Sequence, residues 1–386
     1  MDITENKYLI ASYPNRGVNF ETGDGIYLID TAGNRYLDLG TNYGVSVFGY
    51  KHPRIHSALF HQIQKLITLH GSFGSNIRNS AAKKLIEICG GKMSRVFFSN
   101  SGSEAIETAL KFACLRTNKN NFVAINGSFH GKTLGALSAT SGDKYRTPFL
   151  PLLWKFTHVE KDDVKQLEGA ISTKTAGIII EPIQGEGGIR SFSSSYLTQI
   201  QKLCNERNIM LIVDEIQTGI GRTGTFLASQ QLGLDSDIIC LGKGLAGGIP
   251  IGATIVSEVV ASNIPLHVHT STFGGNPLAS AGVIAVLREF EDNKLLQHIK
   301  DMGDYFLAKL KMINHEKIVD TRGVGLMLAI ELSENVTTYL KALQHEKIIA
   351  IPAGSNIIRF LPPYIITKKE IDKVILALTK IFISKH

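Results

Sequence analysis

Apolar and polar residues follow a pattern that predicts strands alternating with helices through the middle of the chain. Short apolar runs, each followed by a turn or by residues at helical spacing, lie at 95–98, 122–125, 177–180, 209–213 and 238–241. Such runs are typical of buried parallel strands. The repeated strand–helix units between about 95 and 245 therefore predict a mostly parallel, helix-covered sheet of the α/β class.

The two ends of the chain show different patterns. Turn signals and alternating residues predict a small antiparallel meander with strands at 26–30 and 35–39. Helical spacing is present at 53–69, 81–88 and 278–290, and an apolar strand is expected at 249–256. The remainder indicates two helices and several strands, which suits a separate α+β carboxyl-terminal domain. A chain of 386 residues is expected to form two domains.

Two of the predicted central strands end in a charged residue, Asp214 after the first and Lys243 after the second. Ligands of open α/β sheets bind beyond the carboxyl ends of the strands, so both side chains are candidates for one site. A desolvated lysine amine can form a Schiff base, and pyridoxal phosphate enzymes pair such a lysine with an acid beside the pyridine nitrogen. Alternatively, Asp214 caps a turn and Lys243 is a solvated loop lysine. The neighbouring glycines, which admit close ligand approach, favour the shared site.

Two segments are candidates for binding a phosphate or an aromatic ring. Ser99 to Ala105 places hydroxyl residues and a glycine ahead of an alanine-rich helix, which predicts either a phosphate-binding helix N-terminus or a plain N-cap. Between Gly127 and Gly131 there are three residues before Lys-Thr, where a nucleotide phosphate loop has four. This disfavours an NTPase. Phe129 and His130 offer a flat face for an aromatic cofactor, or Phe129 packs in the core.

Further candidates stand in a glycine-rich loop and in an apolar strand. The strand at 177–180 breaks into a loop that holds Glu181 and Glu186, and such loops often carry function. Arg359 lies inside an apolar run, and a buried arginine is expected to have a carboxylate partner. Tyr13 and Tyr43 flank the meander, and sequence alone indicates ordinary half-buried aromatics.

Composition narrows the class of protein. A hydrophobic fraction of 44%, 37 glycines and a net charge of +7 without a basic block suit a soluble α/β enzyme and disfavour nucleic-acid binding. The four cysteines are far apart without Cys-x-x-Cys spacing, so reduced thiols are expected, with no metal site. Met1–Lys7 carry acids, and no apolar run approaches membrane-spanning length. We therefore expect a cytoplasmic protein without a membrane partner.

Taken together, these motifs resemble those of the class III pyridoxal-phosphate aminotransferases of fold type I, and most of all the acetylornithine and ornithine aminotransferases. The resemblance runs from Tyr13 to Pro363 in the family's order. It rests on Ser-Gly-Ser-Glu-Ala at 101–105, Phe-His-Gly-Lys-Thr at 129–133, Glu-Pro-Ile-Gln-Gly-Glu-Gly-Gly at 181–188, Asp-Glu-Ile-Gln-Thr-Gly-Ile-Gly-Arg-Thr-Gly at 214–224, Gly-Lys-Gly at 242–244 and Ser-Thr-Phe-Gly-Gly-Asn-Pro-Leu-Ala at 271–279.

The resemblance implies an arrangement of domains and a set of cofactor contacts. A large cofactor-binding domain would span 46–277 and a small α+β domain 278–386, with the segment 1–45 packed on the small domain. Lys243 would hold pyridoxal phosphate covalently and then carry a proton, and Asp214 would pair with the pyridinium nitrogen. Other contacts to the ring or the phosphate would come from Gly102, Ser103, Phe129, His130, Gln217 and Thr272. Thr272 would reach the phosphate of the neighbouring subunit in a homodimer.

For the substrates, the resemblance implies an amino donor and 2-oxoglutarate. Arg359 would clamp a substrate carboxylate, Glu186 would pair with Arg359 when that place is empty, and Tyr13 would line the mouth. Lys132 stands where the nearest relatives usually have arginine, so the charge is kept but the bidentate fork is lost.

The choice of donor follows less directly from the resemblance than the reaction class does. Tyr43 matches ornithine aminotransferases, whereas the compact length suits an acetylornithine enzyme. N-acetylornithine is therefore the first expectation for the donor, with ornithine or another ω-amine second. An aminomutase or a decarboxylase on the same fold is a further alternative.

Overall fold

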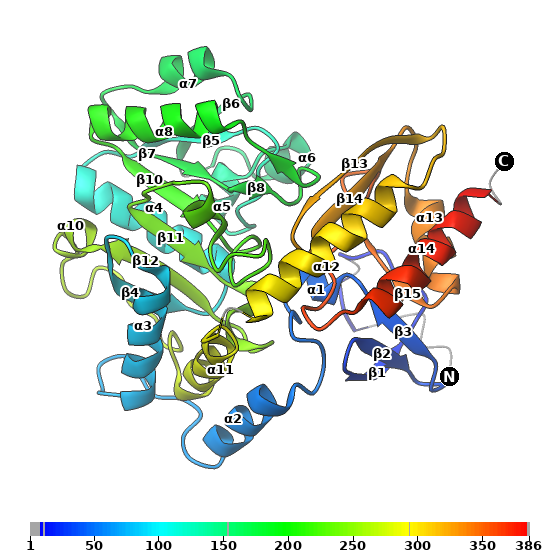
Figure 1. Ribbon diagram of the computed structural model, residues 1–386. Coiled ribbons are helices and arrows are strands. Elements are labelled where there is room, and N and C mark those ends of the chain that lie inside the picture. Colours follow the sequence, from blue (N-terminus) through cyan, green and yellow to red (C-terminus); the bar gives the residue numbers. More distant parts are fainter. Residues whose placement is uncertain (1–7, 11, 153, 293, 384–386) are drawn as a thin grey trace.

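The computed structural model describes residues 8–10, 12–152, 154–292 and 294–383 and shows two parts side by side (Figure 1). Residues 1–7, on which part of the expectation for the amino terminus rests, lie outside this range. The larger part is built on a seven-stranded sheet with one strand, β12, running against the others. Its strands, in spatial order, are β4 (Met93–Ser99), β12 (Gly252–Ser257), β11 (Ile238–Leu241), β10 (Met210–Asp214), β7 (Thr175–Ile180), β5 (Asn121–Ile125) and β6 (Lys155–Val159).

Alternate residues of the central strands pack on helices at opposite faces of the sheet. Ile179 and Ile212 belong to the core beneath α4 (Gly102–Thr117), whereas Ile178 and Leu211 belong to the core that contains residues of α8 (Ser194–Arg207). Because successive side chains of a strand point to opposite faces, a strand covered on both sides must be apolar throughout. The prediction of a mostly parallel, helix-covered sheet is confirmed.

The smaller part contains both ends of the described chain (Figure 1). One antiparallel sheet consists of β13 (Ile318–Val324), β14 (Met327–Leu332), β17 (Ile357–Phe360) and β16 (Ile351–Ala353). A second sheet joins the predicted meander to the carboxyl-terminal region through β1 (Phe20–Asp24), β2 (Tyr27–Asp30), β3 (Arg35–Asp38) and β15 (Ile348–Ile349). The amino-terminal strands thus lie with the carboxyl-terminal elements, as the family resemblance implied.

Two helix expectations were wrong. After α11 the described chain forms three helices rather than two: α12 (Lys294–Lys311), α13 (Thr337–His345) and α14 (Lys368–Ile383). Helix α13 is short and has few buried residues, so the helical spacing of its apolar residues is hard to recognise in the sequence. The helix expected at 53–69 ends at Ile63, because the Gln62 carbonyl accepts the amides of Lys65 and Leu66 in a turn.

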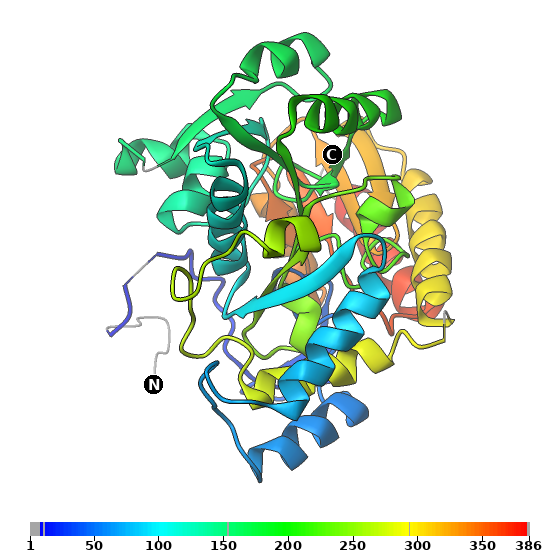
Figure 2. The same ribbon diagram turned by 90° about the vertical axis from the view of Figure 1, so that its left-hand side faces the viewer.

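Helix α11 (Pro277–Arg288) packs against α2 (Pro53–Ile63) and α3 (Asn76–Cys89), beside the large sheet (Figure 2). The division of the chain at 277/278 stays a proposal, and this packing favours a boundary after α11. The remaining elements are short: α1 (Thr41–Gly44), α5 (Leu134–Ala139), α6 (Asp143–Arg146), η1 (Thr147–Phe149), α7 (Val164–Ala170), β8 (Ile183–Gln184), β9 (Arg190–Ser191), α9 (Ala228–Gln231), η2 (Lys243–Ala246) and α10 (Glu258–Ala261).

A buried arginine connects the two parts. Arg222, in the loop after β10, donates from Nη1 to the carbonyl oxygens of Leu326 (2.9 Å) and Pro362 (2.6 Å), both in the smaller part. Its guanidinium lies 4.8 Å from the ring centroid of Tyr364, whose hydroxyl donates to the Ile220 carbonyl at 2.7 Å. Arg222 is 1% exposed, and this set of contacts forms a fixed joint between the parts.

Candidate active site

The strands that carry Asp214 and Lys243 are neighbours. Strands β10 and β11 pair in parallel with Asp214 opposite Cys240, and Lys243 follows two residues after the end of β11. The expectation that both residues reach one edge of the sheet is confirmed. A Cβ built on Gly242 would lie 3.3 Å from the Cα of Gly102, so the N-terminus of α4 adjoins this edge.

Lys243 has the environment of a reactive amine. Burial lowers the pKa of its ammonium group, Asp214 opposes this shift, and the positive charge of Arg359 adds to it. No hydrogen bond or ion pair of the Lys243 amine is found among the described residues, and its backbone φ is +45°, in the left-handed region. A lysine with a lowered pKa and a free amine can attack a carbonyl carbon.

Asp214 is held in place from two sides. It is 4% exposed; its Oδ1 accepts the amide of Ile216 at 3.0 Å, and its Oδ2 contacts Nδ1 of His130 at 2.7 Å. His130 is itself 2% exposed, and its Nε2 has no hydrogen-bond partner in the described part of the chain. The structure therefore places His130 against Asp214, where it fixes the orientation of the carboxylate.

The N-terminus of α4 keeps two amides available while it is capped. The Ser101 hydroxyl accepts the amide of Glu104 at 3.2 Å, so the capping interpretation is correct for Ser101. The amides of Gly102 and Ser103 donate no hydrogen bond within the described residues. A Cβ on Gly131 would lie 2.3 Å from the Ser103 hydroxyl, so only glycine fits there. Two free amides at the start of a long helix suit an anionic group.

Glu181 ties together the loops that carry Phe129 and Glu186. Its Oε1 accepts the amide of Phe129 at 2.9 Å, and its Oε2 accepts the amide of Gly185 at 3.1 Å. Burial raises the pKa of Glu181 to about 7; Asp214 contributes to the rise and His130 opposes it. Phe129 is partly buried, with its ring edge-on to Tyr145 at 5.8 Å between centroids.

Arg359 forms the ion pair expected of a buried arginine. Its Nη2 lies 2.6 Å from Oε1 of Glu186, and its Nη1 donates to Oε1 of Gln217 at 3.2 Å. Arg359 is fully buried, and its Nε has no hydrogen-bond partner among the described residues. Its guanidinium carbon lies 5.7 Å from the ring centroid of Tyr43. Glu186 stands on a glycine-rich loop, and a Cβ on Gly185 would meet Gln217.

Three of the predicted site residues lie outside this cluster. Lys132 is exposed, with its ammonium nitrogen 5.8 Å from the ring centroid of Tyr145. Thr272 is exposed on a loop beside Ser271. Tyr13 is 83% exposed and has no hydrogen bond or ring contact with the other candidates in the described part of the chain.

Two residues that contribute to the site, Glu181 and Tyr145, are not identified by the sequence patterns, and the position of a third, Tyr43, is left open by them. The sequence shows Glu181 only as an acid in a loop, and its pattern does not predict the four-residue helix that carries Tyr145. Tyr43 stands in three successive left-handed residues, Thr41 to Tyr43, with φ values of 43°, 52° and 59°. Non-glycine residues rarely adopt this conformation, so no sequence signal indicated that the ring would face Arg359.

The sheet, the lysine beyond one strand, the acid on the next and the free helix N-terminus define a pyridoxal-phosphate-dependent enzyme of fold type I. Residues 10–382 match the family model described as Aminotransferase class-III, and the chain belongs to this family. It is therefore a pyridoxal-phosphate-dependent aminotransferase, as the sequence motifs predicted.

Relatives and solved structures agree with this assignment. The chain is 41% identical to an acetylornithine aminotransferase of Aquifex aeolicus, over 97% of this chain and 99% of the relative. It superposes with a TM-score of 0.93 and 31% identity on the ornithine aminotransferase of Toxoplasma gondii, covering 98% and 93% of the two chains. A PLP-bound amine transaminase from an uncultivated Pseudomonas species gives a TM-score of 0.92 and 26% identity, covering 99% and 98%.

The residues of this chain fit the cofactor. The free amides of Gly102 and Ser103 suit its phosphate, and Lys243 and Asp214 supply the amine and the acid that its aldehyde and ring nitrogen require. When bound, pyridoxal phosphate supplies an electron sink that stabilises negative charge at the substrate carbon.

Proposed function

We propose that this aminotransferase moves the ω-amino group of N-acetylornithine to 2-oxoglutarate, giving a semialdehyde and glutamate. The ion pair between Glu186 and Arg359 carries the proposal. A donor that presents only an uncharged chain or amine near Arg359 needs no free arginine there, whereas 2-oxoglutarate brings a second carboxylate to it. Glu186 covers the buried guanidinium in the first half-reaction, and its loop glycines let it move aside in the second.

The other residues of the cluster have distinct proposed roles. The Lys243 amine, with its lowered pKa, takes a proton from the donor carbon and returns one, because a neutral amine is required for this step. Asp214, oriented by His130, stabilises a protonated ring nitrogen, and Gln217 approaches the ring hydroxyl. Phe129 supplies a stacking face.

The remaining contacts bind the anionic groups and complete the site. Gly102 and Ser103 hold the phosphate, and Thr272 reaches the phosphate of the neighbouring subunit. Lys132 attracts the donor carboxylate, and Tyr13 lines the substrate mouth.

A panel of donors tests the assignment. N-acetylornithine, ornithine, 4-aminobutyrate, N-succinylornithine and N-acetyllysine are each supplied with 2-oxoglutarate, and glutamate formation is measured. We expect the highest kcat/KM for N-acetylornithine with one glutamate formed per donor consumed. Ornithine is the alternative donor, because Tyr43, which lies beside Arg359, matches ornithine aminotransferases. Highest activity with ornithine would replace N-acetylornithine as the assigned donor. Donor consumption without glutamate would indicate an aminomutase or a decarboxylase instead.

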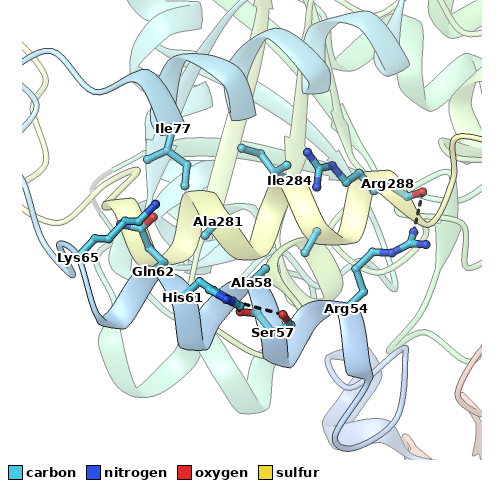
Figure 3. A pocket seen from close by; sticks show the side chains of 11 residues that line it. Arg54, Ser57, Ala58, His61, Gln62, Lys65, Ile77, Ala281, Ile284 and Arg288 are labelled. Carbon is cyan, nitrogen blue, oxygen red and sulfur yellow. Dashed lines mark hydrogen bonds between the residues drawn. The ribbon is translucent and has the colours of Figure 1, made fainter.

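We also propose a homodimer, because the proposed role of Thr272 is to contact the cofactor phosphate of the neighbouring subunit. Exposed apolar side chains gather on α2 and on the chain after it: Phe60, Ile63, Leu66, Ile67 and Phe73. Other residues of α2 line a groove of about 370 Å³ between α2, α3 and α11, which Figure 3 shows from close by. A large exposed apolar area of this kind indicates a protein interface. The groove contains none of the candidate site residues.

Sedimentation of two matched variants tests the dimer. Phe60→Asp should shift the protein toward monomer and reduce activity together, because the Thr272 contact is lost. Leu376→Asp, at an exposed leucine on α14, should do neither. A fully active monomer would contradict the proposal.

The location of the enzyme is a separate proposal. Among the described residues, no helix combines the length and apolar character needed to cross a membrane. We propose a cytoplasmic enzyme, which accords with its free cysteines.

A further inference from the structure

Two lysines share one aromatic ring at the edge of the Phe129 loop. The ammonium nitrogen of Lys132 lies 5.8 Å from the ring centroid of Tyr145, and that of Lys144 lies 4.7 Å from the same centroid. Contacts of this length between a cation and an aromatic ring are attractive and hold the ammonium groups near the ring. Both lysines are exposed, whereas Tyr145 is partly buried. One ring therefore gathers two positive charges.

The ring is fixed relative to the site. Tyr145 meets the Phe129 ring edge-on at 5.8 Å. Phe129 follows β5, which pairs with β7, and β7 pairs in turn with β10, the strand that ends in Asp214. The segment before α6 is anchored by the Ser141 amide, which donates to the Ser128 carbonyl at 2.8 Å. The segment that follows Lys132 is anchored by Glu107, whose carboxylate accepts the amides of Gly135 at 2.7 Å and Ala136 at 3.1 Å.

The two charges have no acidic partner. Neither Lys132 nor Lys144 forms an ion pair in the described part of the chain, in contrast to exposed lysines such as Lys92 and Lys202. Two ammonium groups held near one ring repel each other, and an anion placed between them relieves that repulsion. A lysine is a compact point charge, so two of them from different directions can replace the two-pronged contact that a single arginine makes.

We propose that Lys132 and Lys144, mounted on Tyr145, form a two-cation subsite for the α-carboxylate of the amino donor. The inference rests on the proposed function and deepens it, because it assigns specificity to a lysine outside the recognised motifs. Arg146 does not belong to the subsite, because its Nη1 lies 3.3 Å from Nδ1 of the part-buried His158. The donor class is an ω-amine with a carboxylate at the other end.

A pair of donors that differ only in the carboxylate isolates the effect. N-acetylputrescine is N-acetylornithine without its α-carboxylate, so both present the same amine to Lys243. We expect Lys144→Met to lower kcat/KM for N-acetylornithine about three- to fivefold, mainly through KM, and to leave N-acetylputrescine unchanged. The loss should shrink as salt is added, because exposed charges are screened. Lys165→Met, which removes an exposed lysine on α7, serves as the control for net charge.

A binding measurement gives a readout that does not depend on turnover. N-acetylnorvaline keeps the carboxylate but has no ω-amine, and its affinity is measured by calorimetry on the holoenzyme. Lys144→Met should weaken it and Lys144→Arg should restore it. Tyr145→Leu should weaken it too, because the ring no longer holds the two lysines.

The outcomes separate this inference from the proposed function. Highest wild-type activity with another member of the donor panel would overturn the donor assignment, whereas equal wild-type activity with N-acetylornithine and N-acetylputrescine would overturn the subsite. Discrimination that survives Lys144→Met, or an equal loss for both donors, would overturn the two-cation subsite and leave the donor assignment intact.

Discussion

Replacing Glu186 with glutamine tests whether the Glu186–Arg359 pair is a switch or a fixed structural contact. The wild-type pair joins a fully buried guanidinium to a carboxylate whose side chain is 28% exposed, at 2.6 Å. In Glu186→Gln, Arg359 keeps only neutral acceptors, chiefly Gln217 at 3.2 Å and the Pro352 carbonyl at 3.2 Å. A substrate carboxylate would then no longer compete with a bound charge.

The size of the effect follows from the lost charge of Glu186, since glutamine keeps a hydrogen-bond acceptor at this position. The upper limit is the contribution of a hydrogen bond to a charged group, about 1.5–3 kcal/mol, and each 1.4 kcal/mol is a factor of about ten in rate. Glutamate as donor should therefore gain up to roughly a hundredfold in kcat/KM relative to N-acetylornithine. Arg359→Ala should impair the 2-oxoglutarate half-reaction and spare the ω-amine half-reaction.

Single-turnover absorbance measurements follow each half-reaction separately. Glu206→Gln, on an exposed pair with Lys202, is the matched control and should change neither half-reaction. Equal losses in both half-reactions for Glu186→Gln and for Arg359→Ala would refute the switch and leave a structural ion pair.

Three further substitutions test the core of the site. Lys243→Ala should abolish transamination while the protein still folds, and turnover within about tenfold of wild type would contradict its role. Asp214→Asn should still bind the cofactor, seen by its absorbance, but turn over at least a hundredfold more slowly, because the ring nitrogen loses its acid partner. Glu181 has a raised pKa of about 7 in the folded protein, so its stabilising contribution is present below about pH 4.5 and is lost as pH rises through 7. Wild-type protein should therefore lose unfolding free energy between pH 5 and pH 8, and Glu181→Gln should reduce that loss by up to about 3 kcal/mol. Denaturant titrations at several pH values measure it, and the same dependence of unfolding free energy on pH in both proteins would reject this explanation.

The central sheet was predictable because its strands are buried on both faces. That burial forces continuous apolar runs such as 177–180, and the charged residues that end two runs then mark the edge where a ligand binds. Local chemistry also indicated the N-terminus of α4, but it left a phosphate-binding site and a plain N-cap equally open. These features depend on residues that are close together in the sequence, so they can be recognised without knowledge of tertiary contacts.

Other contributors depend on contacts that sequence does not display. The ring of Tyr43 lies beside Arg359 on a left-handed backbone that the sequence does not signal, and Lys144 is brought near Lys132 by the ring of Tyr145. The rule that a buried arginine requires a carboxylate predicted the partner of Arg359 correctly. Arg222 breaks that rule, because carbonyl oxygens and an aromatic ring surround it instead.

The Arg222 joint has a consequence for how the enzyme responds to its surroundings. Its acceptors are backbone carbonyls, which do not titrate, and a guanidinium keeps its proton at any physiological pH. Because the contacts are buried, added salt screens them little. This joint is therefore insensitive to acidity and ionic strength, whereas the part-exposed Arg190–Glu331 ion pair, which also connects the two parts, is open to both.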